Sequence, residues 1–556
     1  MTRDELREQM AAVAAAEAES LAETLPAPDA EFVGECLQME ERGDGILFAE
    51  LHRGKFVCVE NWGKSGTWLR WAGHHWEIDR RNLVHDAVEA VALTYLQFAG
   101  GLAESITTAR TRLSGAENAL RSLAEGDADA VAGPQAQAEA EKNQCLSELS
   151  GLNRRKKSAL KRVDRLRRMS GATNCLSWAH KIGVERSLTI LGDDIDAHPW
   201  LLACPNGVLD LRTGAFGPSR QDDYLLRSIA VPWEGPDATC PTWDAFIEEI
   251  HQGDREIIAY LDRLFGYCLT GQNSEHFIGC FLGEGRNGKG TMFEVLKELM
   301  GDLGWSIQSE MLMENKGGRS STGPSPDLFD LQGKRFVVAS ESDKNRRISL
   351  SMVKTLTGGD TINARRPFDT DGTNFRPTWK LFLYTNHVPT NITEDFAMQQ
   401  RLIYIRYPLQ FVDSPDPANP LQRKRDPDLP KKLRAELPGI LARYVRGCLE
   451  WQRSGLCPPE RIRKSVDELT KAQDIIRAWF EDNCETAPGH KATVAELGDS
   501  LAAYYDAEVG GPERFRPTKR ALSQWLFHRG FERDRTGGVS AFLGLRLAQA
   551  ETGGWP

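Results

Sequence analysis

The stretch that decides the fold is His276-Phe-Ile-Gly-Cys-Phe-Leu-Gly283-Glu-Gly285-Arg-Asn287-Gly288-Lys289-Gly290-Thr291. An apolar run ends in a glycine-rich loop, and residues 291–300 then have the pattern of a helix. This order predicts a phosphate-binding loop, because glycines let backbone N–H groups turn inward around phosphate oxygens. The residues predicted to contact a nucleotide are Gly283, Gly285, Asn287, Gly288, Lys289, Gly290 and Thr291.

Lys289 is expected to reach the β and γ phosphates, with its side chain facing solvent in the absence of nucleotide. One residue departs from the usual pattern of such loops. Gly290 stands directly after the lysine, where a Ser or Thr usually holds Mg²⁺, and the hydroxyl comes one position later at Thr291. Two alternatives stay open: Thr291 holds the metal ion, or a water molecule replaces the hydroxyl.

Downstream apolar segments end in polar residues that suit nucleotide hydrolysis. One segment ends in Glu341 and Asp343, and a carboxylate at a strand tip can hold Mg²⁺ and polarise the attacking water. The next ends in Asn386, which could orient that water or sense the γ-phosphate. Arg401 lies just before a further apolar segment. Each residue alone is an ordinary strand end, but their order behind a phosphate loop predicts a hydrolysis site.

These residues resemble the superfamily 3 helicases, specifically the helicase portion of phage and plasmid primases, which is similar to poxvirus primase-helicases. The resemblance rests on the loop at 283–291, the Glu341 segment, Leu356-Thr-Gly-Gly-Asp-Thr-Ile-Asn-Ala-Arg365 and Thr385-Asn-His-Val-Pro389. It extends upstream through 204–214 and 265–271, and it covers most of residues 30–550 except a poor match between about 100 and 170.

The resemblance implies an α/β fold with a P-loop, AAA+-like ATPase core, and a homo-oligomeric ring of six subunits that moves along single-stranded DNA. It implies ATP and Mg²⁺ as cofactors. Lys289 and Thr291 would hold phosphate and metal, with Glu341 near the metal and activating water, and Asn386 positioning that water. Arg401 would reach the neighbouring subunit's ATP as a finger that stabilises transition-state charge.

The resemblance also places a DNA contact after Arg365. The chain from Arg365 to Phe375, with its Asp371-Gly372 turn, looks like the hairpin that family members project into a central channel. Arg365, Arg366 and Asn374 are therefore predicted to contact single-stranded DNA, whose phosphates attract cations.

Composition limits the remaining classes. A chain of 556 residues predicts three or four domains, and a net charge of −10 disfavours a DNA-coating protein but allows a locally basic channel. Eleven cysteines without a Cys-x-x-Cys pair favour scattered reduced thiols over a zinc ribbon. No apolar run has membrane length and the first residues have no signal core, which predicts a cytoplasmic protein of a bacterial host with no membrane partner.

The predicted organisation has five parts. They are a leader at 1–29, an α+β N-terminal region at 30–245 with a helical hairpin inserted at about 102–170, the P-loop ATPase at 246–412, a linker and helical lid at 413–470, and a winged-helix domain at 471–556. The hairpin is expected to break at Asp127–Pro134. Its second arm carries nine Lys and Arg residues between Arg154 and Arg168, either a solvated helix face or a contact for DNA or a partner.

Two further sets of residues have structural alternatives. Trp62, Trp68, Trp71 and Trp76 could stack on bases, but such aromatics more often belong to a core. Lys519 and Arg520 begin the third helix of the predicted winged-helix domain, where a major-groove reader would carry them. Winged helices also dock proteins, so the sequence leaves both functions open.

The function predicted from all this is an ATP-dependent replicative DNA helicase. An ATP-switched, origin-binding initiator or remodeller with little unwinding is an alternative that the C-terminal domain and the acidic charge allow. A primase-helicase in one chain is disfavoured, because the sequence has no zinc ribbon and no convincing set of primase acids. The helicase half of such a system, with a separate primase as partner, fits better.

Overall fold

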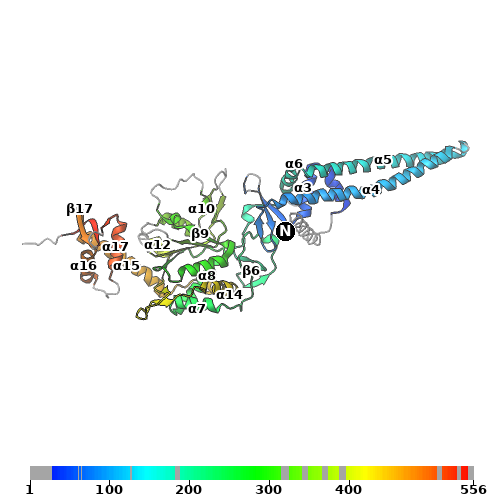
Figure 1. The fold of residues 1–556 in the computed structure, drawn as a ribbon. Helices are drawn as coiled ribbons and strands as arrows, with labels where there is room; N and C mark the ends of the chain where they lie inside the picture. Colours follow the sequence, from blue (N-terminus) through cyan, green and yellow to red (C-terminus); the bar gives the residue numbers. More distant parts are fainter. Residues whose placement is uncertain are drawn as a thin grey trace, which may run out of the picture. The chain divides into compact units, whose positions relative to one another are not determined.

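The computed structural model describes most of the chain. The described residues are 28–60, 62–63, 66–124, 128–181, 188–314, 325–340, 348–365, 373–386, 396–509, 516–534 and 540–548. The predicted leader lies almost wholly outside them. The chain divides into two compact units, one of Met1–Ala72 with Trp76–Ile195 and the other of Gly73–His75 with Asp196–Pro556 (Figure 1). Each unit is described by itself below.

The first unit packs three helices against a small sheet. The helices are α2 (Ala30–Gln38), α3 (Glu40–His52) and α6 (Met169–Lys181), and the strands are β1 (Phe56–Val59), β2 (Thr67–Trp71), β3 (Trp76–Ile78) and β4 (Thr189–Ile190), in the order β3-β2-β1-β4. Trp76 is 1% exposed, and Trp68 packs edge-on against Phe48. These two tryptophans therefore belong to the core, as expected. A 3-10 turn at Gly192–Asp194 follows β4.

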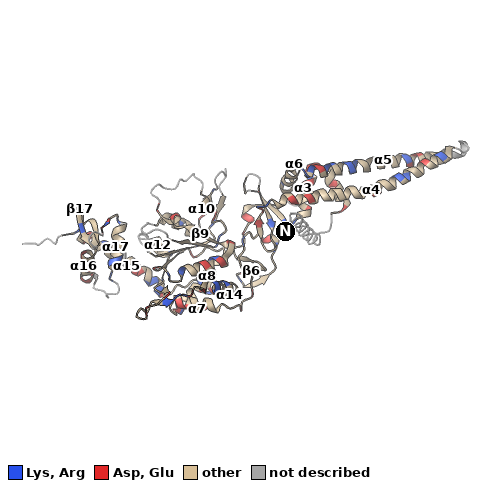
Figure 2. Ribbon diagram, viewed as in Figure 1, with Lys and Arg blue, Asp and Glu red and all other residues tan. Residues whose placement is uncertain are grey.

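Two long helices occupy the region where the sequence predicts a helical hairpin, and they extend beyond residues 102–170 at the N-terminal side. They are α4 (Leu83–Ala124) and α5 (Ala128–Leu166), which run side by side (Figure 1). Residues 128–134, Pro134 included, belong to α5, so the expected break at Asp127–Pro134 is wrong from Ala128 onward. The first arm starts early because Val88, Val91 and Tyr95 bury an apolar face in the core of the unit. Lys and Arg gather in the half of α5 nearest α6 (Figure 2).

The second unit begins with a three-stranded antiparallel sheet and two helices. The strands β5 (Leu201–Cys204), β6 (Gly207–Asp210) and β7 (Ala215–Gly217) are joined by turns at residues 205–206 and 211–214, where the pairs Asn206-Gly207 and Thr213-Gly214 are typical of hairpins. A short 3-10 helix, η2 (Gln221–Asp223), comes next. The helices α7 (Pro241–Ile250) and α8 (Arg255–Cys268) then lead into the central sheet.

A five-stranded parallel sheet forms the centre of this unit. Its strands are β8 (Ile278–Leu282), β9 (Gly304–Gln308), β10 (Phe336–Ser340), β13 (Lys380–Thr385) and β14 (Leu402–Arg406), in the order β14-β8-β13-β10-β9. Both faces of the sheet are buried, because alternate side chains of a strand pack in two different hydrophobic clusters, one on each face. Phe281, Val338 and Phe382 pack with α8 and α9 (Lys289–Met300), whereas Cys280, Val337 and Leu383 pack with α11 (Leu350–Thr357). The fold is therefore mixed α/β with several sheets, as predicted.

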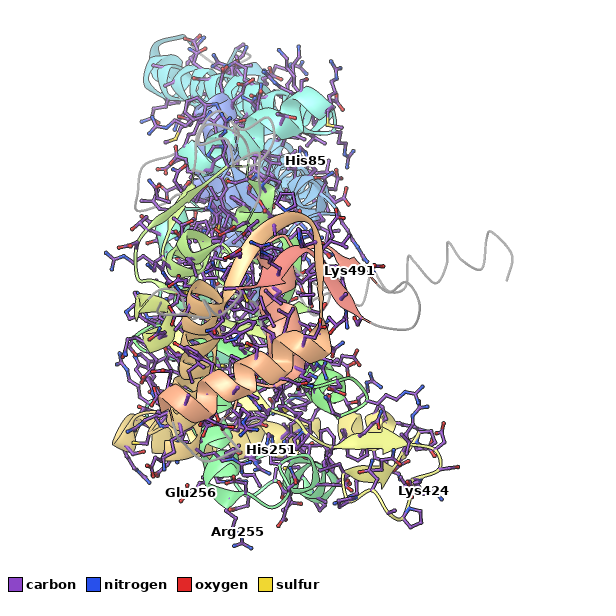
Figure 3. All side chains as sticks on the ribbon, turned by 90° about the vertical axis from the view of Figure 1, so that its left-hand side faces the viewer. His85, His251, Arg255, Glu256, Lys424 and Lys491 are labelled. Carbon is purple, nitrogen blue, oxygen red and sulfur yellow. The ribbon has the colours of Figure 1, made fainter. Side chains whose placement is uncertain are left out.

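Shorter elements complete the region around the sheet. They are η3 (Gly301–Leu303), η4 (Ser309–Leu312), α10 (Pro326–Phe329), β11 (Ile362–Ala364), β12 (Thr373–Phe375), α12 (Phe396–Arg401), β15 (Gln410–Val412) and β16 (Gln422–Lys424). The stretch expected to be a linker thus contains a strand, because β16 pairs with β15 in parallel. Lys424 extends from this strand pair into solvent (Figure 3).

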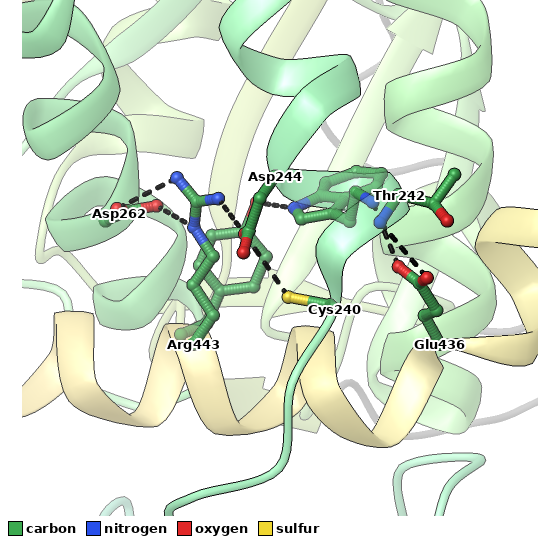
Figure 4. Close-up of polar contacts among 8 residues, drawn as sticks. Cys240, Thr242, Asp244, Asp262, Glu436 and Arg443 are labelled. Carbon is green, nitrogen blue, oxygen red and sulfur yellow. Dashed lines mark hydrogen bonds and ion pairs between the residues drawn. The ribbon is translucent and has the colours of Figure 1, made fainter.

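Two helices that follow the sheet in the chain are hydrogen-bonded to α7 and α8, which precede it. They are α13 (Leu429–Ala435) and α14 (Leu437–Ser454). The carboxylate of Glu436 accepts hydrogen bonds from the backbone N–H groups of Thr242 and Trp243 at 3.1 and 3.0 Å, which caps α7 (Figure 4). Arg443 of α14 donates to Asp262 of α8 at 2.7 and 3.1 Å and also pairs with Asp244 of α7. These bonds connect segments about two hundred residues apart in the chain.

The C-terminal region has three helices and a small antiparallel sheet. The helices are α15 (Glu460–Asn483), α16 (Val494–Tyr504) and α17 (Lys519–His528), and α16 continues into a π-helical turn, η5 (Tyr505–Val509). The strands are β17 (Cys484–Thr493), β18 (Arg533–Asp534) and β19 (Ala541–Leu547). Their order in the sheet is β17-β19-β18. The first helix begins at Glu460 instead of Lys471, because no Gly or Pro interrupts it. Val466 packs in the core beside the parallel sheet, whereas Ile476 and Trp479 belong to the C-terminal core.

Substitution of Arg443 tests the connection between α14 and the helices before the sheet. Arg443→Ala would leave Asp262 without its cation, and we expect the free energy of unfolding to fall by about 3 kcal/mol, measured by chemical denaturation. Arg453→Ala is the matched control on the same helix, since its side chain is 76% exposed, and a change below about 0.5 kcal/mol is expected there. Equal losses in the two variants would contradict this role of Arg443.

Candidate functional site

The loop between β8 and α9 turns tightly around its own backbone. Gly285 and Gly288 have positive φ angles of 95° and 86°, a region that glycine enters without strain. A Cβ atom at Gly288 would lie 2.7 Å from Cγ2 of Ile250. A Cβ atom at Gly283 would lie 2.0 Å from Nδ2 of Asn287 and 2.7 Å from the carbonyl oxygen of Tyr407. Gly283 and Gly288 are therefore required by close packing, as the predicted phosphate loop demands.

Lys289, the first residue of α9, is buried inside this loop. It is 3% exposed, so the expectation that its side chain faces solvent is wrong. Its Nζ donates a hydrogen bond of 2.7 Å to the carbonyl oxygen of Gly283, because the loop folds back over the helix N-terminus. Burial lowers the pKa of Lys289 to about 8. A phosphate group entering the loop would offer this cation a charged acceptor in place of a backbone carbonyl.

Asn287 lies beside Lys289 and provides a second donor. Its side chain is 3% exposed, and Oδ1 accepts from the backbone N–H of Lys289 at 3.4 Å. Its buried Nδ2 has no hydrogen-bond partner among the described residues. A buried donor without an acceptor costs about 1–3 kcal/mol, and an anion bound in the loop would satisfy it. The loop therefore fits a phosphate group.

The carboxyl ends of neighbouring strands meet at this loop. The backbone N–H of Gly283 donates to the carbonyl oxygen of Thr385 at 3.1 Å, which places the exposed Asn386 next to the start of the loop. The strand β10 ends at Ser340, paired with Tyr384 at the same edge. Glu341 and Asp343 follow it but lie outside the described residues. In the described part of the site, Lys289 and Thr291 share the first turn of α9, and Asn386 follows the residue that is bonded to the start of the loop.

Arg401 lies at the amino ends of the strands, opposite the end at which the glycine-rich loop begins. It ends α12, and the next residue, Leu402, pairs with Ile278 at the start of β8. One strand of five residues, about 16 Å long, therefore separates Arg401 from the loop of its own chain. Its Nη1 donates to the carbonyl oxygen of Ala397 at 2.9 Å. The structure does not bring this arginine to the other predicted site residues.

The predicted DNA hairpin exists as two short paired strands. β11 and β12 are antiparallel, and Nδ2 of Asn363 donates to Oδ1 of Asn374 at 2.8 Å. Asn374 is exposed, and Arg365 follows β11 with its backbone bonded to Ser325. Arg366 and the Asp371-Gly372 turn lie outside the described residues.

The two cations at the start of α17 are exposed and paired with acids. Nζ of Lys519 donates to Asp499 at 2.6 Å. Arg520 pairs with Glu284, a residue of the glycine-rich loop. Nothing in the sequence indicated the second contact, because the two residues are 236 positions apart and neither belongs to a recognisable motif with the other.

His251 and Tyr407, which the sequence did not single out, lie behind the glycine-rich loop. The hydroxyl of Tyr407 lies 3.2 Å from Nε2 of His251, and the backbone N–H of Tyr407 donates to the carbonyl oxygen of Leu282 at 2.7 Å. Burial lowers the pKa of His251 to about 4, so this histidine is neutral at pH 7. The position of Tyr407 at a strand end was the one signal that could have identified it.

In the part of the chain that the structure describes, no three His, Cys, Asp or Glu side chains are grouped so that they could hold a metal ion. No helix within the described ranges is long and apolar enough to cross a membrane.

Comparison with known families finds two matches. A model described as D5 N terminal like matches residues 45–252, and a family of unknown function (DUF5906) matches residues 281–401. The second match contains the glycine-rich loop, Asn386 and Arg401.

Curated relatives are viral proteins. "Putative helicase L207/L206" of Acanthamoeba polyphaga mimivirus is 26% identical over 349 residues, 60% of this chain and 36% of that protein. "Putative primase C962R" of African swine fever virus is 23% identical over 243 residues, 41% of this chain and 25% of the relative. "Uncoating factor OPG117" of Vaccinia virus is 25% identical over 248 residues, 41% and 30% of the two chains. The chain thus spans about a third or less of the length of these relatives.

Among solved structures, the apo structure of the NrS-1 C terminal region (305-718) is similar with a TM-score of 0.33 and 14% identity. The match covers 55% of this chain and 76% of that one, and so low a TM-score carries no argument about the fold. The family matches and the named viral relatives agree with the motifs around the glycine-rich loop. Together these matches support the resemblance of this chain to the D5-like primase-helicases.

Proposed function

We propose that this protein is an ATP-dependent replicative DNA helicase of phage or plasmid type, which forms a ring and moves along single-stranded DNA. The observation that carries the proposal is the loop at the start of α9. A buried cation, Lys289, and a buried amide donor on Asn287 face the same small space at a helix N-terminus. Such an arrangement suits the triphosphate of a nucleotide.

The strand order supports a P-loop, AAA+-like core. β8 lies between β14 and β13: its own connection runs to β9 at the far edge of the sheet, and the later strands return from there until β14 is placed on the other side of β8. Ligands of open parallel sheets bind at the carboxyl ends of the strands where the order reverses in this way. The glycine-rich loop begins at that point.

Within this proposal each site residue has a role. Lys289 and Thr291 hold phosphate and Mg²⁺, Glu341 contributes to the metal site and polarises the attacking water, and Asn386 positions that water. Bound Mg²⁺ would neutralise part of the phosphate charge. A Cβ atom at Gly290 would meet nothing within 4 Å, so packing does not exclude a serine there. Thr291 is the hydroxyl that this chain offers.

The place of Arg401 supports action between subunits. A residue about one strand length from its own loop would contribute little to its own nucleotide, whereas it could reach the site of a neighbour in a ring. We therefore propose a homo-oligomer, a hexamer in line with the family, with ATP bound between subunits.

DNA contacts are proposed for two places. Arg365, Arg366 and Asn374 belong to the β11–β12 hairpin, which would carry phosphates through the ring. The three helices and three strands of the C-terminal region support a winged-helix domain. Lys519 and Arg520 could contact DNA only after leaving Asp499 and Glu284, and such exposed ion pairs contribute about 0–1 kcal/mol each.

An ATP-switched initiator or remodeller is the second candidate. The ion pair between Arg520 and Glu284 favours it, because this contact would let the state of the nucleotide loop influence the C-terminal domain. The resemblance to a protein named as a primase also fits a helicase that works with a separate primase. Strand displacement on a forked substrate distinguishes a helicase from an initiator with little unwinding.

Lys289→Ala is the direct test of the proposal. The wild-type protein should hydrolyse ATP and displace a strand from a forked DNA, and the variant should lose at least about 10²-fold in both rates. Lys297→Ala is the control, because Lys297 is an exposed residue of the same helix. Normal turnover by a folded Lys289→Ala protein would overturn the site, and ATPase without strand displacement in the wild type would favour the initiator.

Arg401→Ala tests whether this arginine acts on the ATP bound by a neighbouring subunit of the proposed ring. The variant should bind nucleotide but hydrolyse it about 10³-fold more slowly, because a finger acting on the neighbour stabilises only transition-state charge. Mixing Arg401→Ala with Lys289→Ala subunits should restore part of the ATPase activity that neither has alone. If subunits exchange, as measured by fluorescence energy transfer, and activity stays absent, Arg401 acts within its own chain or in folding.

Removal of residues 475–556 tests whether ATP hydrolysis requires the C-terminal region of the second unit. The shortened chain should retain most DNA-stimulated ATPase activity, because every proposed catalytic residue precedes residue 475. Ile476 and Trp479 leave with the C-terminal core to which they belong, whereas Val466 stays with the core beside the parallel sheet. Loss of ATPase activity from a folded protein would mean that the C-terminal domain completes the site or the ring.

A further inference from the structure

The basic half of α5 is the feature that the proposed function leaves unexplained. Nine Lys and Arg residues lie between Arg154 and Arg168, with Asp164 as the one acid among them, in a chain whose net charge is −10. In the first unit this stretch lies next to α6 (Figure 2). The structure separates these cations into two groups according to what they contact.

Three of these cations hold α5 and the residues just after it on neighbouring helices, two on the other arm of the hairpin and one on α3. Arg162 is buried and pairs with the buried Asp44 of α3 at 3.4 Å. Arg167 donates to Glu89 of α4 at 2.6 Å, and the guanidinium of Arg155 lies 5.8 Å from the centre of the Phe98 ring. These three have structural contacts that account for their presence.

A second group forms a stripe along one exposed side of α5. Its members, the basic stripe, are Arg154, Lys157, Lys161, Arg165 and Arg168. They follow one another at intervals of three or four residues, which places the first four on a single face of α5, and Arg168 comes two residues after the end of the helix at Leu166. The buried Ala159 and Val163 lie on the opposite face. The stripe covers fifteen residues, about 20 Å along the chain at helical spacing.

Most of the basic stripe has no structural partner. Arg165 pairs with Glu41. Among the residues that the structure describes, Arg154, Lys157, Lys161 and Arg168 make no ion pair, and all four are exposed. Like charges at this spacing on one face repel each other and destabilise an isolated helix by a few tenths of a kcal/mol per pair. Their arrangement thus has a cost in the free protein that a bound polyanion would remove.

We propose that the basic stripe of α5 binds the phosphate backbone of a nucleic acid, as a second contact surface outside the ATPase unit. A row of cations on a rigid helix matches a polyanion whose charges repeat every few ångströms along a line. The contact is independent of sequence, because cations that point at phosphates read no bases. Single-stranded and double-stranded DNA share this chemistry, and the experiment distinguishes them.

The test compares the full chain with a variant in which Arg154, Lys157, Lys161 and Arg168 are all changed to Gln. Binding of fluorescent single-stranded and duplex DNA is measured by anisotropy without nucleotide, at several salt concentrations. We expect binding at low salt to weaken about tenfold or more for the form of DNA that the stripe binds. The slope of log K against log salt should become shallower by about 3 to 4 for duplex, or just under 3 for a single strand.

A matched control separates position from net charge. In the control variant Arg110, Arg121, Lys424 and Lys431, four exposed cations elsewhere, are changed to Gln, which removes the same charge. Its slope should stay close to that of the wild type. Thermal unfolding and DNA-independent ATPase activity should be unchanged in both variants, so a failure of the proposed helicase site would be visible separately.

The outcomes are distinct. A loss confined to the stripe variant supports the proposal, and the DNA form affected identifies the ligand. Equal losses of DNA affinity in both variants would overturn it. An unchanged affinity and salt slope in the stripe variant would also overturn it, and an acidic protein surface would then be the partner left for this helix. As a direct check, a photo-crosslinking amino acid at position 161 should label DNA, whereas the same residue at position 424 should not.

Discussion

The parallel pairing of β8 on both of its sides is the constraint on which the candidate site depends. β8 is hydrogen-bonded to β13 and to β14 in the same register, so Leu282 lies between Thr385 and Arg406. The chain must leave the sheet at this point through a space already bordered by two other strand ends. Gly283 is the residue that fits there, and its carbonyl oxygen then faces back toward the start of α9. The positions of Lys289, Asn386 and Tyr407 follow from this single exit point.

The same geometry explains why the site is polar yet buried. The helix N-terminus, Lys289 and Asn287 together concentrate positive potential in a loop with little exposed surface. The desolvation of Lys289 lowers its pKa, which means that burial disfavours the charged form until an anion compensates it. Beneath the loop, the neutral His251 and the hydroxyl of Tyr407 add no charge that would oppose a phosphate.

Local signals were predictable from the sequence, and contacts between distant residues were not. The strand, loop and helix at 276–300 and the turns at Asn206-Gly207 and Thr213-Gly214 follow from short patterns of glycine and apolar residues. The burial of Lys289 could not be predicted, because it depends on how the loop closes over its own backbone. Pro134 was misread as a break: it is the seventh residue of α5, where a proline removes one backbone hydrogen bond, but this helix gains its stability from packing against its partner arm. The pairing of Arg520 with Glu284 depends on tertiary structure alone.

The capping of α7 by Glu436 determines how small an autonomously folding fragment of this chain can be. The N-terminal N–H groups of α7 and the carboxylates of Asp244 and Asp262 find their partners on α14, beyond the last strand of the parallel sheet. Trp451 adds a hydrogen bond of 2.7 Å to Glu275, just before β8. A fragment cut at residues 246 and 412 would keep every strand of the sheet but lose the first half of α7 and all of α14, so Asp262 and Glu275 would lack their partners. A fragment that starts ahead of Cys240 and continues past Trp451 retains them, and limited proteolysis would leave a core with those borders.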